Sequence, residues 1–344
     1  MTDDRTNGAP APGDGHGARR PAVVLANLGT PSAPTPSHVR RFLREFLSDR
    51  RVVETHPLLW RPVLEGVVLR VRPRVVAKKY AGIWTPQGSP LMRYTLRQAE
   101  LLGRRMPDVD VLAAMRYGEP GLGAVLDALY ARGTRRVAVL PAYPQYSATT
   151  VASLNDVAAQ WLRRNRDGFD LRLVRSFPTA PAYIDALASA LESHWGRCGR
   201  PDFAAGDAVV VSFHSIPEAM DRAGDPYRSE CMGTVAALEA RLGLARGALT
   251  VAFQSVFGPA AWLGPATIDT VTRLGARGCA RLDVICPGFM ADCLETLEEI
   301  DQLNREAFTR AGGSGFHYVP WGNDSEGAVS ALAEQARTAV AGWV

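Results

Sequence analysis

The chain has 344 residues, of which 47% are hydrophobic and 22% are charged, and this length is enough for two α/β domains of ordinary size. The formal net charge of +4 is too small to indicate nucleic acid as the partner. The sequence contains no Walker-type loop, dinucleotide fingerprint or Gly-x-Ser-x-Gly elbow, so nucleotide chemistry and serine hydrolysis are poorly supported.

Residues 1–20 are rich in glycine, proline, alanine and charge, without the apolar core of a signal peptide, so we expect a disordered leader. Beyond it, short apolar runs alternate with segments of helical periodicity. The apolar runs predict strands at 22–26, 109–114, 136–140, 170–174, 208–213, 249–253 and 281–285. The segments between them predict helices at 36–47, 58–80, 92–105, 120–132, 149–165, 181–196, 226–243, 265–275, 292–311 and 325–341.

Strands that alternate with helices are typical of parallel sheets covered by helices on both faces. We therefore predict an α/β fold with two such sheets. The expected divisions are the leader at 1–20, an N-terminal α/β domain at 21–170, a C-terminal α/β domain at 171–324 and a C-terminal helix at 325–344.

The segment from Arg40 to Lys79 carries eleven lysine and arginine residues but only four acidic ones. A solvated helical surface explains this excess, and so does attraction for an anionic substrate or for anionic lipid headgroups. Residues 58–69 suit either a membrane-facing patch or a buried or lip-forming helix. Peripheral membrane contact is therefore an expectation, although no apolar run reaches the length of a membrane span.

The five cysteines form no C-x-x-C pair. An odd number of cysteines without metal-ligand spacing is typical of reduced thiols in a cytosolic protein. We therefore expect a cytoplasmic location and free, buried cysteines.

Six of the seven apolar runs are followed at once by polar, aromatic or turn-forming residues. Ligands of open parallel sheets bind outside the carboxyl ends of the strands, so these segments predict an aromatic pocket with a few convergent polar groups, suited to a large flat ligand. The segments are Asn27–Pro31, Met115–Gly118, Pro141–Ser147, His214–Pro217, Gln254–Gly258 and Cys286–Phe289.

One of these segments, and the predicted helix that follows another, carry groups suited to proton transfer. His214 ends an apolar strand and could act as a base, although a lone histidine at a strand end is more often a structural hydrogen-bonding group. Asp292, Glu295 and Glu299 are spaced i, i+3 and i+7 and would share one face of an α-helix. Such a face could relay cations or protons, or it could be the solvated side of an ordinary amphipathic helix.

The chain resembles the ferrochelatase family, in a style similar to its Gram-negative bacterial members. The resemblance runs from about Val23 to about Val319. It implies two Rossmann-like domains of chelatase-like fold and a lyase-class chelatase that inserts ferrous iron into protoporphyrin IX, the last step of haem biosynthesis. The segments that carry it are Asn27–Pro31, Phe46–Val53, Gly88–Leu91, Tyr143–Ser147, Ser212–Pro217 and Cys286–Glu299.

The resemblance also assigns roles to residues. His214 matches the family's catalytic histidine and Glu295 the glutamate across the cleft, and both are the expected metal-binding residues. Asp292 and Glu299 lie on the family's acidic helix, where they would form a metal or proton channel. The expected substrate-binding residues are Leu28, Arg116, Tyr117, Tyr143 and Tyr146.

The sequence departs from the family pattern at three positions. Val256 stands where many bacterial relatives have arginine, and Ala266 where they have tyrosine. Ala148 fills the central cysteine position of relatives that carry a 2Fe–2S cluster, so we expect no cluster and no tightly bound cofactor, with Fe2+ as a substrate. Two alternatives stay open: a divergent chelatase that metallates another tetrapyrrole or a non-porphyrin chelator, and a tetrapyrrole-binding protein without catalysis.

Overall fold

A computed structural model describes residues 19–256 and 260–344. The first of its two sheets has four parallel strands in the order β2-β1-β3-β4. These strands are β1 (Ala22–Gly29), β2 (Asp110–Tyr117), β3 (Arg136–Pro141) and β4 (Asp170–Leu173). Strand β1 is buried on both faces, because Val23 and Leu25 pack into one apolar layer and Val24 and Ala26 into the other. Burial on both faces explains why the strand reads as a continuous apolar run.

The second sheet is also parallel, in the order β6-β5-β7-β8. Its strands are β5 (Ala208–His214), β6 (Thr250–Gln254), β7 (Arg281–Ile285) and β8 (Gly315–Tyr318). The predicted α/β class with two parallel sheets is therefore confirmed. Strand β8 was not predicted, because Gly315–Tyr318 includes a glycine and a histidine and is not an apolar run; it pairs with β7.

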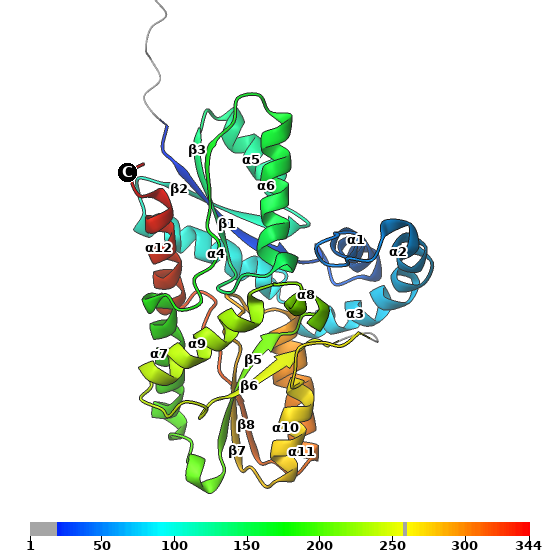
Figure 1. Cartoon of the computed structure of the whole chain (residues 1–344), viewed down its shortest axis with the longest axis vertical. Coiled ribbons are helices and arrows are strands. Elements are labelled where there is room, and N and C mark those ends of the chain that lie inside the picture. Colours follow the sequence, from blue (N-terminus) through cyan, green and yellow to red (C-terminus); the bar gives the residue numbers. More distant parts are fainter. Residues whose placement is uncertain (1–18, 257–259) are drawn as a thin grey trace, which may run out of the picture.

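Helices cover both faces of the two sheets (Figure 1). In the N-terminal half they are α1 (Pro36–Leu47), α2 (Pro57–Val63), η1 (Leu64–Val68), α3 (Leu69–Ile83), α4 (Pro90–Arg105), α5 (Leu122–Ala131), η2 (Ala148–Ala152) and α6 (Ser153–Arg164). The others are α7 (Pro181–Cys198), η3 (Phe203–Ala205), α8 (Glu218–Arg222), α9 (Tyr227–Arg241), α10 (Thr267–Ala276), η4 (Glu295–Asn304), α11 (Arg305–Arg310) and α12 (Glu326–Val340). The predicted helix at 58–80 is thus divided into α2, the π-helical turn η1 and α3.

The first sheet extends a few residues past position 170, where the expected N-terminal domain ends. Strand β4 begins at that residue and pairs with β3, so the first sheet extends to Leu173. Helix α12 also returns to the first half of the molecule, where it packs against α4 and β3 as well as α7. The Trp343 indole N–H donates to Asp170 at 2.9 Å, which fastens the C-terminus beside β4.

The carboxyl ends of the two sheets face each other across the middle of the molecule, and α1 to α3 project to one side (Figure 1). Contacts between distant segments hold this arrangement. The Gln98 amide of α4 donates to the carbonyls of Met290 and Asn323, both at 2.7 Å, and Lys79 of α3 pairs with Glu298 of η4 at 2.9 Å. Within the described ranges, no helix combines the length and apolar character needed to cross a membrane.

Candidate active site

His214 is the last residue of β5 and is half-buried at the carboxyl end of the sheet. Its Nδ1 lies 2.6 Å from the backbone carbonyl oxygen of Ser215. A carbonyl oxygen only accepts hydrogen bonds, so Nδ1 carries the proton and Nε2 keeps its lone pair. The turn that follows is fixed, because Ser215 donates its N–H to Gln254 at 2.8 Å and its hydroxyl to Leu263 at 2.9 Å. The imidazole is therefore held in the tautomer that can accept a proton or bind a metal.

The acidic helix has a different helix type and different bounds from those predicted from the sequence. Residues 295–304 form the π-helix η4 rather than part of an α-helix from 292 to 311. A π-helical turn contains more than four residues, so Glu295 and Glu299 lie on roughly the same face. Asp292 precedes the helix and is not on that face. π-Helical turns are rare and frequently mark functional sites.

Glu299 is tied to the end of β6 by Ser255. The Ser255 backbone N–H donates to one carboxylate oxygen at 2.7 Å, and its hydroxyl donates to the other at 2.5 Å. Ser255 has a φ of +65°, a conformation that costs a non-glycine residue about 1–2 kcal/mol. Burial raises the pKa of Glu299, while the Ser255 bonds and the nearby His214 oppose the rise and Glu295 adds to it. His214, Glu295 and Glu299 therefore form one electrostatic group.

Glu295 lies at the first position of η4 and faces both halves of the molecule. Its backbone carbonyl accepts from the Gln254 side chain at 2.8 Å, and its carboxylate accepts from the Cys293 thiol. Burial raises the pKa of Tyr80 and of Tyr143, and in both cases the nearby Glu295 raises it further. These tyrosines come from the N-terminal half, so Glu295 lies where the two sheets face each other.

Asp292 is built into a separate network. One of its carboxylate oxygens accepts from Tyr318 at 2.6 Å and from Thr296 at 2.8 Å, and the other accepts from Asn323 at 2.6 Å. The side chain is buried, with 8% exposed. These bonds anchor the segment before η4 to β8 and to the loop that follows it. A channel role for Asp292 stays a prediction.

On the opposite side, Arg116 and Tyr117 end β2 and converge on Asp49. One Asp49 oxygen accepts from the Arg116 guanidinium, the Tyr117 hydroxyl at 2.8 Å and the Ser153 hydroxyl. The Asp49 and Arg116 side chains are only 9% and 18% exposed. In the sequence, Asp49 stands out only as part of the family segment Phe46–Val53. Its pairing with Arg116 leaves no local pattern, because 67 residues separate the two.

The remaining expected substrate-binding residues differ in their surroundings. Leu28 is half-buried against the cluster that contains Tyr117. The Tyr143 hydroxyl is buried and has no hydrogen-bond partner among the described residues, and burial raises its pKa, with Tyr117 adding to the rise. Tyr146 instead stacks under the Arg175 guanidinium at 4.6 Å. Leu28, Tyr117 and Tyr143 thus lie close to one another, while Tyr146 belongs to an ionic surface cluster.

A cavity of about 490 Å³ opens between the loops after β1 and β2. Apolar and aromatic side chains from α1, α4 and the loop before α4 line it together with polar groups. Among its lining residues are Thr30, Phe42, Trp84, Met92 and Gly118. Polar and charged side chains, among them His38, Arg41, Glu45 and Glu119, also line it, whereas His214, Glu295 and Glu299 do not.

Two parallel sheets that face each other, with a basic imidazole and two carboxylates at their meeting point, define an α/β protein of the chelatase type. The fold is similar to that of SirB from Bacillus subtilis, solved with Fe3+, with a TM-score of 0.53 and 14% identity over 74% of this chain and 92% of that one. This likeness concerns the fold alone.

Sequence comparisons define the family. The family model described as ferrochelatase matches residues 20–340. The chain is 49% identical to the ferrochelatase of Methylibium petroleiphilum, over 97% of this chain and 92% of the relative, and 46% identical to that of Polaromonas sp., with the same coverage. The chain therefore belongs to the ferrochelatase family and is a lyase-class metal chelatase that takes ferrous iron as a substrate.

Proposed function

We propose that this enzyme inserts ferrous iron into protoporphyrin IX and that His214 accepts the protons that leave the pyrrole nitrogens. The observation that carries the proposal is the fixed tautomer of His214, in which Nδ1–H is bonded to Ser215 and Nε2 keeps its lone pair. Membership of the ferrochelatase family indicates which substrate the enzyme uses. A positioned base of this kind contributes about 10²–10⁴-fold to a rate.

The carboxylates supply the second half of the chemistry. Glu295 lies where the sheets face each other, and its negative charge attracts a hard dication. Glu299 lies in the same electrostatic group as His214 and has a raised pKa because it is buried. Its affinity for a proton is therefore greater than that of an ordinary carboxylate, which suits it to receive a proton from the imidazole and pass it to solvent.

The N-terminal half supplies the binding surface for the macrocycle. Leu28 and Tyr143 are partly exposed and give an apolar and aromatic wall, which suits a flat porphyrin. Tyr117 is fully buried and packs in the cluster that Leu28 contacts, so it supports this wall from within. Arg116 carries the positive charge that suits a propionate, and Asp49 fixes the direction of its guanidinium. Val256 is 46% exposed, so the absence of the arginine that many relatives have here leaves no buried charge unpaired, and this agrees with protoporphyrin as substrate.

The test is anaerobic iron insertion by His214→Ala, followed by absorbance and repeated with a panel of porphyrins and divalent metals. We expect turnover to fall at least about 100-fold while protoporphyrin binding and the fold are retained. The matched control is His56→Ala, because His56 is exposed and only caps α2. Retention of more than about a tenth of wild-type turnover by His214→Ala would exclude this role for the base.

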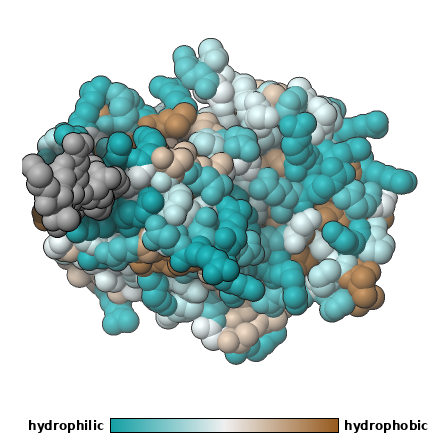
Figure 2. Space-filling model, turned by 90° about the horizontal axis from the view of Figure 1, so that it is seen from above, coloured by the Kyte–Doolittle hydropathy of each residue, from teal (hydrophilic) through white to brown (hydrophobic). Residues whose placement is uncertain are grey.

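We further propose that α2, η1 and α3 contact the surface of an anionic membrane. Leu59, Val63, Val67, Val71 and Val75 recur every four residues, and each is between 45% and 71% exposed. Figure 2 shows apolar patches at the end of the molecule where α2 and α3 project in Figure 1. The exposed basic residues of this region, Arg61, Arg70, Arg74 and Lys78, would meet anionic headgroups.

Co-sedimentation with vesicles tests this contact. We expect binding to phosphatidylserine-containing vesicles and weaker binding to pure phosphatidylcholine. The double substitution Leu58→Ser and Leu59→Ser should weaken binding by about tenfold or more, since each fully buried leucine contributes about 1.5–3 kcal/mol. Ile268→Ser is the control, because Ile268 is 42% exposed on α10. Equal binding by all three proteins would exclude this surface.

Two further properties complete the proposal. All five cysteines are free in the described part of the chain, which supports a reducing compartment such as the cytoplasm. We also propose that the enzyme works without a 2Fe–2S cluster, because Ala148 stands at the central cysteine position.

A further inference from the structure

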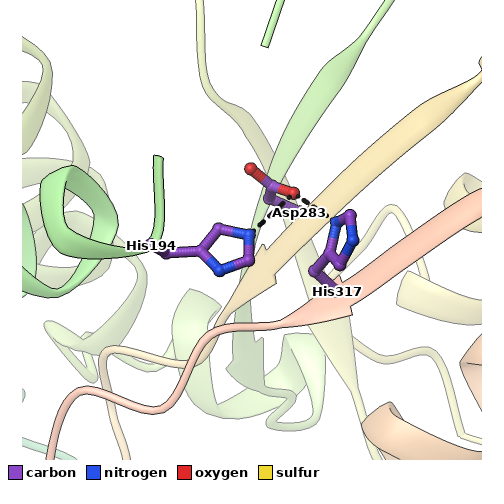
Figure 3. A group of neighbouring side chains, drawn as sticks. All are labelled: His194, Asp283 and His317. Atoms are coloured by element: carbon purple, nitrogen blue, oxygen red, sulfur yellow. Dashed lines mark hydrogen bonds and ion pairs between the residues drawn. The ribbon is translucent and has the colours of Figure 1, made fainter. Parts of the chain in front are cut away.

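Three side chains far apart in sequence meet on the second sheet, away from His214. Figure 3 shows His194 of α7, Asp283 of β7 and His317 of β8 pointing toward one another. Asp283 and His317 are paired in register on neighbouring strands. The Asp283 Oδ1 atom lies 2.9 Å from His317 Nδ1 and 3.4 Å from His194 Nε2. One potential ligand atom from each residue lies within 4.8 Å of the other two.

This cluster is separated from the active site by the sheet itself. Leu282 and Val284 of β7 pack into the apolar layer that contains Ile300 of η4. Successive side chains of a strand point to opposite faces, so Asp283 points to the α7 side, where it accepts from the Trp195 indole at 2.9 Å. The carboxylates of η4 and the histidine cluster therefore lie on different faces.

One nitrogen of the cluster lacks the partner that its burial requires. His194 is only 8% exposed, and its Nε2 makes no hydrogen bond within the described ranges; its one polar contact shown there is with Asp283 Oδ1, at 3.4 Å (Figure 3). A buried polar atom without a partner is uncommon, because it loses its bonds to water and gains none in return. A ligand between His194 and Asp283 would satisfy this nitrogen.

Neighbouring groups fix the direction of the Asp283 carboxylate. Arg281 donates to Oδ1 at 3.1 Å and to Oδ2 at 3.0 Å, and Trp195 also donates to Oδ2. Hydrogen bonds of this kind to a carboxylate are the usual support of metal ligands. Oδ1 remains directed at the two imidazoles, as its distances to them show.

We propose that His194, Asp283 and His317 bind one divalent ion of the first transition series, such as zinc. Two atoms that each lie about 2.1 Å from one tetrahedral or octahedral ion are about 3.0–3.4 Å apart, which matches both distances from Asp283. Two imidazoles and a carboxylate are a common ligand set for such ions. The His317 side chain is 36% exposed, so the ion reaches the site from solvent and keeps a water ligand.

Binding of the ion changes the protonation of His317 and connects helix α7 with strands β7 and β8. The ion replaces the hydrogen between His317 Nδ1 and Asp283 Oδ1, and the imidazole then carries its proton on Nε2. The ion fastens α7 to the edge of the sheet, and α7 packs in turn against α9 and α12. An ion that binds only the folded protein raises its melting temperature.

The test is titration of the full-length protein with Co2+, followed by its visible absorption, which reports ligand type and geometry. The background variant is His214→Ala with Glu295→Gln, so that the active site does not bind the ion. We expect one equivalent to bind in this background. The further substitution His317→Ala should weaken that binding at least tenfold, while His56→Ala, the control, should leave it unchanged.

His194→Asn provides a second variant, in case His317→Ala perturbs the fold, and circular dichroism checks both. In the background variant Zn2+ should also raise the melting temperature, and this rise should be absent when either His317→Ala or His194→Asn is added. The proposal is overturned if the background variant binds no Co2+, or if folded His317→Ala or His194→Asn binds it as tightly as the background. Iron insertion is not involved in this readout, so failure here leaves the proposed function untouched.

Discussion

Asp49 holds Arg116 and Tyr117 in place at one side of the active site. The substitution Asp49→Asn tests how much the stability of the protein and its porphyrin binding depend on this one negative charge. Its carboxylate accepts hydrogen bonds from Arg116, Tyr117 and Ser153 and from the Arg51 backbone N–H at 2.8 Å. Asparagine keeps the shape but loses the charge and one acceptor oxygen. Arg116 then keeps its contacts with Ser153, at Oγ and at the carbonyl oxygen, and its place over the Tyr117 ring at 4.4 Å, but loses its ion pair.

The expected loss in the free energy of unfolding follows from the burial of the ion pair. Breaking a buried ion pair by removing one partner costs about 3–5 kcal/mol. Here the side chains are 9% and 18% exposed, and the amide oxygen of asparagine still accepts part of the bonds. We therefore expect the free energy of unfolding to fall by about 2–4 kcal/mol at pH 7. Loss of the fixed positions of Arg116 and Tyr117 should also weaken porphyrin binding about fivefold or more, which corresponds to about 1 kcal/mol.

The effect should depend on pH in a defined direction. Burial by itself would raise the pKa of Asp49, but hydrogen bonds from Ser153, Arg51 and Tyr117 and the charge of Arg116 outweigh it and lower that pKa. A carboxylate with a lowered pKa in the folded state stabilises the protein above its unfolded pKa near 3.9, and the stabilisation is lost as pH falls through the folded pKa. The difference between wild type and Asp49→Asn should therefore be full at neutral pH and shrink below about pH 4.

Urea unfolding, followed by tryptophan fluorescence at several pH values, measures this difference. Asp156→Asn is the control, because Asp156 pairs with Arg51 at 2.8 Å and both side chains are 44–45% exposed. An exposed pair contributes only about 0–1 kcal/mol. Equal losses for Asp49→Asn and Asp156→Asn, or a difference that does not change with pH, would refute the reasoning.

Three further outcomes are expected. Ser255→Gly should change the free energy of unfolding by less than about 1 kcal/mol, because relief of strain at φ +65° offsets the lost hydroxyl bond to Glu299; turnover should fall several-fold, and unchanged turnover would contradict this role. Val256→Arg should leave steady-state kinetics on protoporphyrin within about fivefold, because the position is exposed, and a larger change would place residue 256 in substrate selection. Purified protein should contain no acid-labile sulfide, since Ala148 replaces a cluster cysteine, and near-stoichiometric sulfide would contradict this.

The sequence by itself determined the class of the fold and most of its elements. Apolar runs such as Ala22–Ala26 and Ala208–Phe213 predicted strands because central strands of parallel sheets are buried on both faces. It also placed His214 at a strand end, where the structure finds it. These features depend on neighbours within a few residues, so local patterns reveal them.

Only the tertiary structure decided which polar groups meet. The spacing of Asp292, Glu295 and Glu299 predicted one helical face, but the π-helix keeps the two glutamates together, and Asp292 is bonded to Tyr318. Strand β8 is not an apolar run, and the structure pairs it with β7.

Only the tertiary structure revealed the two polar clusters around Asp49 and around Asp283. Asp49 meets Arg116 across 67 residues of sequence, and His194 meets Asp283 because α7 packs on the face of β7 that carries this side chain. Hydrogen bonds and ion pairs between distant segments leave no periodicity in the sequence. Their partners are set by the order of the strands and by the helices that cover them, which only the folded chain defines.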